Sequence, residues 1–176
     1  MRLTLCTVLL VALFFSGAAY GVASAGELAV VDVDRIFRES EPGKAGDAHL
    51  KQARDILQKG FEDLRALYKG KEDTAEAVAA LREGHAALER QFAADRLAVR
   101  QVLTTTLEKV IRTWFEGQGQ RDATRAVAPA NAFFVFSPVL DVTDAILREM
   151  NEERPVFPPL PTVRVRANQA NPPPSP

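Results

Sequence analysis

Few residues of this sequence have the chemistry of a catalytic or metal-binding site, and they lie far apart. His49 and His85 are the two histidines, and a metal site would need further ligands around them. Asp32 begins a D-x-D pair that could hold a cation, but no second acidic cluster completes it, and a strand end is the favoured interpretation. Ser40 and Ser137 have no nearby histidine and no nucleophile elbow. The pattern predicts a protein that is not an enzyme, with no metal and no cofactor.

Composition narrows the classes of function further. The chain has 176 residues, which allows one modest domain. Its single cysteine, Cys6, lies in a leader that we expect to be removed, so the mature chain should have no disulfide and no cysteine zinc site. Loss of Arg2 with that leader leaves 21 basic against 23 acidic residues. Such a balance carries no electrostatic signal for a nucleic-acid partner.

The first 25 residues have the features of a secretory signal peptide. Arg2 precedes an apolar run at 3–15, which is too short for a comfortable membrane span. Ala23-Ser24-Ala25 is a small-residue cleavage site, so we expect cleavage after Ala25 and export. The alternatives are an uncleaved membrane anchor and a lipoprotein, the latter disfavoured because Cys6 lies inside the apolar run. No other segment is long and apolar enough to span a bilayer, so the mature chain should have no transmembrane segment.

A short strand and a first amphipathic helix are predicted at the start of the mature chain. Residues 28–33 read L-A-V-V-D-V, which is short and rich in β-branched side chains, as in a strand. Pro42, Gly43 and Gly46 then interrupt, and the glycines are expected to let the chain turn. Apolar residues at heptad-like spacing predict a helix over 47–68.

A second and longer helix is predicted over 75–115. Asp73 with Glu76 forms a capping-box-like start. An apolar stripe that ends at Trp114 covers about ten helical turns. Two such stripes favour an antiparallel helical hairpin over 47–116, a coiled-coil-like arm that projects from another part of the protein.

The rest of the chain predicts a strand hairpin, a short helix and a tail. The hairpin is expected over 124–136, with a turn at Pro129-Ala130-Asn131. A short helix is expected over 142–151, capped by Asp141. Residues 154–176 contain eight of the eleven prolines, which predicts an extended, disordered tail. A linker or a protein-binding proline segment is the alternative.

The predicted strands form a very small body for so long an arm. The strand at 132–136 (A-F-F-V-F) is apolar on both faces, which implies burial on both sides. Oligomerisation through the strands would pair their edges and supply that cover. The expected fold is therefore α+β, with a small β body formed on assembly and a long antiparallel helical hairpin. The residues expected in that body are Val30, Val31, Val33, Phe133, Phe134, Val135 and Phe136.

Two stretches resemble the Skp/OmpH family of periplasmic outer-membrane-protein chaperones. "LAVVDVDRIFRESEPGKAG", from Leu28, is similar to the family's opening strand, followed by an apolar-aromatic pair and a Gly-Lys step. "AVAPANAFFVFSPVLDVTDAILREMNE", from Ala126, is similar to the family's closing strand hairpin and helix start. The order of elements also matches, and the resemblance covers about residues 28–153.

The resemblance implies a homotrimer in which strands of three subunits build a small β-barrel and three helical hairpins hang from it. It implies an ATP-independent holdase of the periplasm that keeps unfolded outer-membrane β-barrel proteins in the cavity between its arms. The best-known members are strongly basic along the arms, whereas residues 44–120 here carry 13 basic and 12 acidic side chains. Electrostatic attraction to acidic clients or anionic lipid is therefore not expected.

Aromatic residues on the predicted arm have two interpretations. Phe61, Tyr68 and Phe92 either hold the two helices together or contact clients. Tyr68 is the best client-contact candidate, because it lies beside the predicted tip, where the least helix is available for packing. Gly60 and Gly84 lie inside predicted helices, where each costs about 1 kcal/mol relative to alanine. These glycines either let the arm bend, or they mark a close approach of the helices or an irregular turn.

A structural role is the second hypothesis for the whole protein. An envelope coiled-coil spacer or adaptor would have the same helical arm, would show no chaperone activity, and could reach a partner through the Pro-rich tail.

Overall fold

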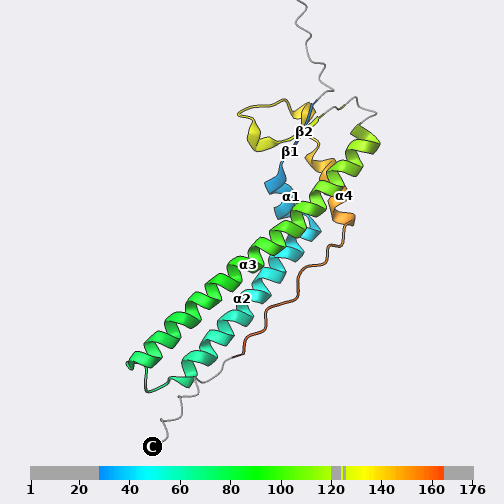
Figure 1. Ribbon diagram of the computed structural model, residues 1–176. Helices are drawn as coiled ribbons and strands as arrows, with labels where there is room; N and C mark the ends of the chain where they lie inside the picture. Colours follow the sequence, from blue (N-terminus) through cyan, green and yellow to red (C-terminus); the bar gives the residue numbers. More distant parts are fainter. Residues whose placement is uncertain (1–27, 120–123, 125, 165–176) are drawn as a thin grey trace, which may run out of the picture.

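The computed structural model describes residues 28–119, 124 and 126–164. Two long helices, α2 (Glu41–Leu67) and α3 (Ala75–Trp114), lie side by side and antiparallel (Figure 1). The other elements gather where α2 begins and α3 ends. This end, the body, contains β1 (Leu28–Val31), α1 (Val33–Glu39), β2 (Ala126–Pro129) and α4 (Thr143–Glu152). A π-helical turn, η1 (Phe115–Gly119), and two 3₁₀ turns, η2 (Ala130–Ala132) and η3 (Pro138–Leu140), lie between α3 and α4.

The chain is α+β, as predicted, with long helices and a small two-stranded sheet. The predicted leader, residues 1–25, lies outside the described residues, and so do 165–176 of the predicted tail and position 125 of the predicted hairpin. Among the helices of the described residues, none has both the length and the apolar character needed to cross a membrane.

The two strands are parallel neighbours, so the predicted strand hairpin at 124–136 is wrong. β2 pairs with β1 in a register that runs from Leu28–Ala126 to Val31–Pro129. It ends at Pro129, which has no N–H to continue the ladder. The residues after it enter η2 and then an extended segment that is not a strand. The N-terminal strand therefore takes the place of the expected hairpin partner.

β1 is shorter than predicted because Asp32 caps a helix. The Asp32 carboxylate oxygen Oδ1 accepts a hydrogen bond from the Arg35 N–H at 2.9 Å, which is N-cap geometry. Val33, which was expected in the strand, is the first residue of α1.

A single serine makes the corner between α1 and α2. The Ser40 N–H donates to the Ile36 carbonyl and ends α1, while the Ser40 hydroxyl accepts from the Gly43 N–H at 3.1 Å and starts α2. Pro42 occupies the first turn, where its missing N–H costs nothing. α2 therefore begins at Glu41, before the predicted start at 47, and Ser40 is fully buried.

The glycines that were expected to turn the chain lie inside α2. A Cβ at Gly43 would overlap the backbone carbonyl of Phe37 in α1. A Cβ at Gly46 would lie 3.1 Å from Val99 Cγ1 and 3.2 Å from Leu103 Cδ1 of α3. Gly43 therefore has no room for a side chain and Gly46 has little, so α2 approaches its neighbours closely at both positions.

The connection between α2 and α3 occurs close to where it was predicted. Gly70 has φ 81°, the left-handed region that glycine favours. Thr74, rather than Asp73, is the N-cap of α3, and its hydroxyl accepts from the Ala77 N–H at 3.2 Å. α3 has 40 residues and α2 has 27. At about 1.5 Å per residue these helices are roughly 60 and 40 Å long, so α3 continues past the start of α2 into the body.

The main hydrophobic core lies in the body. The C-terminal half of α3 supplies one side of it, and β1, α1 and α4 supply the other. Its buried members are Ala29, Val31, Ile36, Val99, Leu103, Leu107, Val110, Trp114, Ile146 and Met150. The N-terminal strand is therefore covered within one chain, by elements that come from both ends of the sequence.

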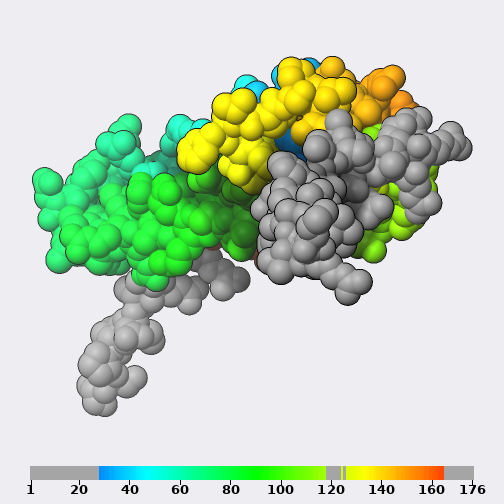
Figure 2. Space-filling model, turned by 90° about the horizontal axis from the view of Figure 1, so that it is seen from above, coloured from blue at the N-terminus to red at the C-terminus, as the bar shows by residue number. Residues whose placement is uncertain are grey.

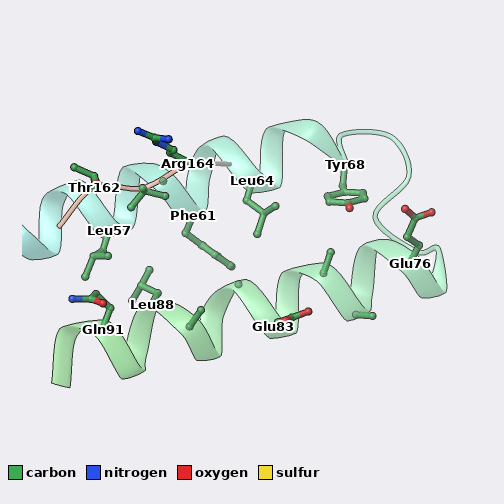
Figure 3. A pocket seen from close by; sticks show the side chains of 16 residues that line it. Leu57, Phe61, Leu64, Tyr68, Glu76, Glu83, Leu88, Gln91, Thr162 and Arg164 are labelled. Atoms are coloured by element: carbon green, nitrogen blue, oxygen red, sulfur yellow. The ribbon is translucent and has the colours of Figure 1, made fainter. Parts of the chain in front are cut away.

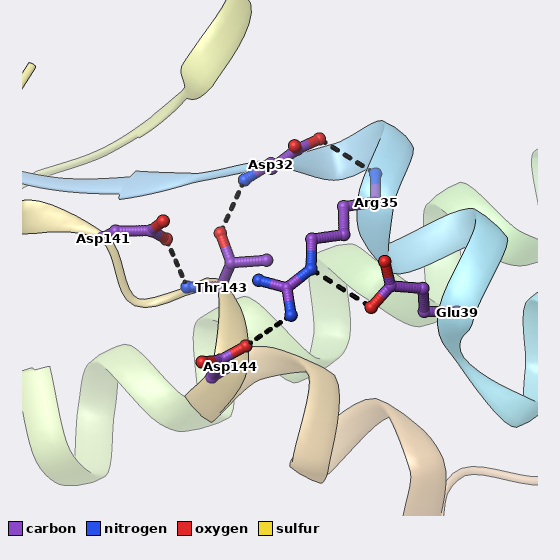
Figure 4. A network of polar contacts seen from close by, with 6 residues as sticks. All are labelled: Asp32, Arg35, Glu39, Asp141, Thr143 and Asp144. Carbon is purple, nitrogen blue, oxygen red and sulfur yellow. Dashed lines mark hydrogen bonds and ion pairs between the residues drawn. The ribbon is translucent and has the colours of Figure 1, made fainter. Parts of the chain in front are cut away.

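A polar network ties α4 to β1 and α1 (Figure 4). The Thr143 hydroxyl, almost fully buried, accepts from the Asp32 N–H at 2.9 Å. Arg35 forms ion pairs with Glu39 at 3.1 Å and Asp144 at 2.8 Å. The hydrogen bond to Glu39, followed by the charges of both carboxylates, raises the pKa of Arg35.

The start of α4 differs from the predicted cap. The N-cap position is Val142, whose N–H donates to the Val30 carbonyl at 3.0 Å. Asp141, predicted as the cap, lies one residue earlier, and its Oδ1 accepts from the Thr143 N–H at 2.9 Å. The helix is attached to the sheet through its first turn.

Residues 154–164, the strap, are extended as predicted but lie along α2 (Figure 1). The Phe157 ring lies 5.5 Å from the His49 ring, between centroids, and packs at the edge of the core. Val163 packs against Gly60. The expectation of a tail without packing contacts is therefore wrong for this part of the Pro-rich segment, because two of its apolar side chains pack on α2.

Candidate binding groove at the tip of the helical pair

A groove lies between α2 and α3, close to their connection (Figure 3). Its volume is about 660 Å³, which is within the usual range of ligand pockets. One wall is α2, the other is α3, and the end of the strap closes one side. We call this the tip groove. Its apolar and aromatic lining from α2 consists of Leu57, Phe61, Leu64 and Tyr68.

Small residues of α3 form the opposite wall of the tip groove. They are Ala79, Ala80, Gly84 and Ala87, with Leu88 as the one large aliphatic side chain. A Cβ at Gly84 would overlap Leu64 Cδ2 across the groove. A narrow stretch of α3 without bulky side chains therefore faces the large residues of α2. Such a surface lets another backbone approach closely.

The structure brings two of the three predicted client-contact residues together. Phe61 and Tyr68 both line the tip groove and are half-buried. Phe61 also packs edge-on against His85, with 5.8 Å between ring centroids. Phe92 is not among the lining residues, and the Arg54 guanidinium lies 4.7 Å above its ring. Phe92 therefore joins α2 to α3 by a cation–π contact.

Sequence reasoning missed the small residues and the strap. Gly60 and Gly84 were recognised as unusual in helices, and both sit where a neighbouring side chain approaches, Val163 at Gly60 and Leu64 at Gly84. Close helix approach, one of the predicted interpretations, accounts for Gly84, whereas Gly60 is approached by the extended strap and not by a helix. The alanines at 77, 79 and 80 were a signal for a narrow helix face. No local pattern indicated which segment would lie against it.

Charged and polar side chains also line the tip groove. Glu76 and Glu83 belong to its lining from α3, and Arg164 belongs to its lining from the strap. Glu72, in the connection beside the groove, accepts a hydrogen bond from the backbone of Gly70, which lowers its pKa. The groove therefore combines apolar walls with acidic side chains near the tip.

The predicted body residues separate into two groups. Val30 and Val31 are buried within the chain itself, and Val33 packs against the core from α1. Phe133 and Phe136 are half-buried and pack against each other, with 6.3 Å between centroids. Phe134 and Val135 are among the most exposed large apolar residues. They lie on a surface lobe formed by 126–140 (yellow in Figure 2).

Residues with metal or acid–base chemistry do not converge in this structure. Over 28–119, 124 and 126–164, no three His, Cys, Asp or Glu side chains come together in a way that could hold a metal ion. His85 stacks against Phe61, and His49 stacks against Phe157. Asp32 caps α1. Each of these residues has a structural partner.

Comparisons of the chain with protein-family models, with characterised proteins and with solved structures found no match.

Proposed function

We propose that the protein is an ATP-independent periplasmic holdase that binds unfolded outer-membrane β-barrel proteins. The observation that carries the proposal is the tip groove, an open cavity between two long antiparallel helices with the apolar and aromatic side chains of Leu64, Phe61 and Tyr68 in its lining. The resemblance of the opening and closing segments to the Skp/OmpH family supplies the client class. The proposal assigns no catalytic step and no nucleotide.

The groove supports holding by burial of apolar surface. Each Å² of apolar surface removed from water contributes about 25 cal/mol. The contact of a few client side chains with Leu64, Phe61 and Tyr68 is therefore weak by itself. Many such contacts along several helical pairs would retain an unfolded chain by avidity. Clients held between helices are kept from other unfolded chains, which is how a holdase prevents aggregation.

Charge plays a minor part in this mechanism. The helical region 44–120 has nearly equal numbers of basic and acidic residues. Screening by salt weakens only interactions between charges. Client binding should therefore change little between low and moderate ionic strength, unlike binding by a strongly basic arm.

We further propose that the protein works as a homotrimer. Phe134 and Val135 are exposed on the lobe at 126–140, and Val139 follows on the same lobe. Exposed apolar residues in one patch are typical of protein interfaces. A trimer would cover the lobe and set three helical pairs around a shared cavity. The β-barrel implied by the resemblance would need the lobe to pair with strands of other subunits.

The chaperone proposal is tested by aggregation of a client. A urea-unfolded outer-membrane β-barrel protein is diluted into buffer with increasing amounts of the chain from Gly26, and light scattering is followed. We expect scattering to be suppressed near stoichiometric amounts, with little dependence on salt. Unchanged scattering at a large excess would contradict the proposal.

Variants locate the binding surface. Phe61→Ser combined with Tyr68→Ser should reduce the suppression several-fold, because both side chains line the tip groove. Leu97→Ser is the matched control, since Leu97 is 69% exposed on α3 and does not line the groove. Equal loss in both variants would mean that the groove is not the client surface.

The trimer is tested by mass in solution. Light scattering on a sizing column should give three times the chain mass, and Phe134→Asp should shift the protein towards a monomer. Val156→Asp is the control, because Val156 is also highly exposed but lies on the strap. A wild-type monomer at all concentrations would remove the trimer from the proposal.

A structural spacer is the second candidate function. It is favoured by the packing of the aromatic residues, because Phe61 stacks against His85 and Phe92 lies under Arg54. Both rings help to hold α2 against α3. A spacer would leave client aggregation unchanged in the experiment above and would keep the same helical content.

A further inference from the structure

The strap lies along α2 over much of its length. Phe157 packs where Gly46 and His49 lie, and Val163 packs at Gly60. The six residue steps from Phe157 to Val163 span roughly 19 Å in an extended proline-type conformation. The fourteen residue steps from Gly46 to Gly60 span roughly 21 Å of helix. The two apolar side chains of the strap therefore match two glycines of α2.

Glycine is required at the second of these contacts. A Cβ at Gly60 would overlap the Val163 side chain. A Cβ at Gly46 would make an ordinary van der Waals contact with the Phe157 ring, at 3.5 Å, and its tight contacts would be with Val99 and Leu103 of α3. We call the α2 surface around Gly46, His49 and Gly60 the strap site. It is a docking surface for an extended chain, and the chain's own strap shows how such a segment is bound.

Apolar contact holds the strap, with little help from hydrogen bonds. The Arg154 guanidinium donates to the Asn151 and Glu153 carbonyls at the end of α4. Of the hydrogen bonds between described residues, none joins 155–164 to α2 or α3. Four prolines in this segment lack an N–H donor. Val163 keeps 41% of its surface exposed. The attachment is therefore one that a competing segment can replace.

The tip groove continues the strap site towards the α2–α3 connection. Thr162, Val163 and Arg164 form part of its lining. Beyond them the groove is lined by Leu64, Tyr68 and the small residues of α3. Arg164 and the carboxylates of Glu76 and Glu83 have opposite charges. An extended segment with aliphatic side chains and a basic residue fits this continuation.

We propose that the strap site and the tip groove form one binding track for extended polypeptide, and that the strap is its resident, exchangeable occupant. An extended client segment that carries an aromatic and a β-branched residue at the strap's spacing takes the place of the strap. This inference rests on the proposed function, because it names how that function's clients would engage the groove.

Peptide binding to the full chain tests the exchange. The probe is a dye-labelled peptide of the strap sequence, RPVFPPLPTVR, and its anisotropy is measured with wild type and with Val163→Asp. In wild type the strap occupies the binding track, whereas in Val163→Asp the charged aspartate side chain releases the strap from it. If the strap is bound for about nine-tenths of the time, its release should tighten peptide binding about tenfold.

Two further variants control the peptide experiment. Gly60→Leu added to Val163→Asp blocks the strap site and should abolish the gain. Val156→Asp changes an exposed strap residue that is not in contact with Gly46 or Gly60. This variant should bind the peptide like wild type. Helical circular dichroism confirms that each variant is folded. Equal peptide binding by wild type and Val163→Asp, or no binding by either, would overturn the proposal.

A second measurement on wild-type protein removes any dependence on the variants. The methyl NMR signals of Val163 should move to a free-strap position when unlabelled peptide is added in excess. Val163 signals that stay unchanged at saturating peptide would overturn the exchange. Signals that move only when the chain associates with a second copy of itself would also overturn it. Neither experiment contains an outer-membrane protein. Their failure would leave the holdase proposal intact, and failed aggregation protection would leave strap exchange intact.

Discussion

The body and the tip of this molecule are filled by different kinds of side chain. In the body, large residues such as Ile36, Ile146 and Met150 are fully buried between four elements. In the tip half, α2 from Ala53 onward and α3 up to Leu97, the buried positions are few and mostly small. They are Ala53, Leu57, Gly60 and Ala77.

This difference places stability in the body and the proposed binding in the tip half. The body buries the large apolar surface that drives folding. The tip half keeps larger residues such as Phe61 and Leu64 half-buried around an open groove. A groove that binds other chains must leave apolar surface uncovered, and the molecule can tolerate this because its core lies elsewhere.

The largest expected effect tests where the stability lies. Ile146→Ala removes a fully buried side chain from the body, and it should lower the free energy of unfolding by about 2–5 kcal/mol. Leu64→Ala removes a half-buried side chain at the groove and should cost clearly less. Urea denaturation followed by circular dichroism measures both. Equal losses would show that the two regions contribute alike.

A pair of glycines sharpens the same contrast. Gly43→Ala places a Cβ on the Phe37 backbone carbonyl, which cannot rotate away, and should cost about 1–3 kcal/mol. Gly84→Ala meets only the flexible end of Leu64, and the helix gains up to about 1 kcal/mol from alanine. Its unfolding midpoint should therefore stay the same or rise. A large loss for Gly84→Ala would mean that the tip is packed as rigidly as the body.

The buried hydroxyl of Thr143 offers a smaller effect. Thr143→Val leaves the Asp32 N–H without its acceptor in a buried site, so unfolding should become about 1–2 kcal/mol easier. Thr105→Val, at an exposed position of α3, is the control. If both variants unfold at the same urea concentration, the contact between β1 and α4 does not depend on this hydrogen bond.

The smallest effect concerns the ion pairs beside it. Arg35→Gln removes contacts to Glu39 and Asp144 that are open to solvent, so the urea midpoint should shift less than for Thr143→Val. Exposed pairs contribute little and are screened by salt. The difference from wild type should vanish at about 1 M salt, where the screening length is about 3 Å. A shift that persists at that salt concentration would indicate packing by the Arg35 side chain.

Periodicity predicted the long helices well because each has a continuous apolar stripe. The predicted start of α3 at 75 is confirmed, and its end differs by one residue. The start of α2 was predicted late, since Pro42, Gly43 and Gly46 look like breakers in a sequence. Pro42 is tolerated in the first helical turn, and the glycines are needed for close packing.

Strand pairing could not be predicted with the same success. The segment A-F-F-V-F has strong β propensity, yet it forms no strand, and Phe134 in its centre is exposed. β2 pairs instead with a strand about a hundred residues upstream. Propensity describes how well a residue suits a pleated surface, and the choice of partner depends on what else lies nearby.

The residues of the candidate site were also only partly predictable from the sequence. The aromatic residues and the unusual glycines of the two helices could be identified from their types and spacing. Their grouping could not, because Phe61 and Tyr68 share the tip groove while Phe92 lies under Arg54. The packing of the strap on α2 could not be predicted from local patterns. Prolines predict an extended chain, but they do not indicate which segment that chain contacts.

The period of apolar residues thus determined that this protein has two long helices, and the positions of glycine and proline determined the turn at Gly70 and the extended Pro-rich segment. These features depend on interactions between residues close together in the chain. Only the tertiary structure decided that β1 pairs with β2, that α4 closes the body over Ile36, and that Val163 lies on Gly60. Those contacts join distant segments, and their free energy depends on shape and burial that no local window of sequence contains.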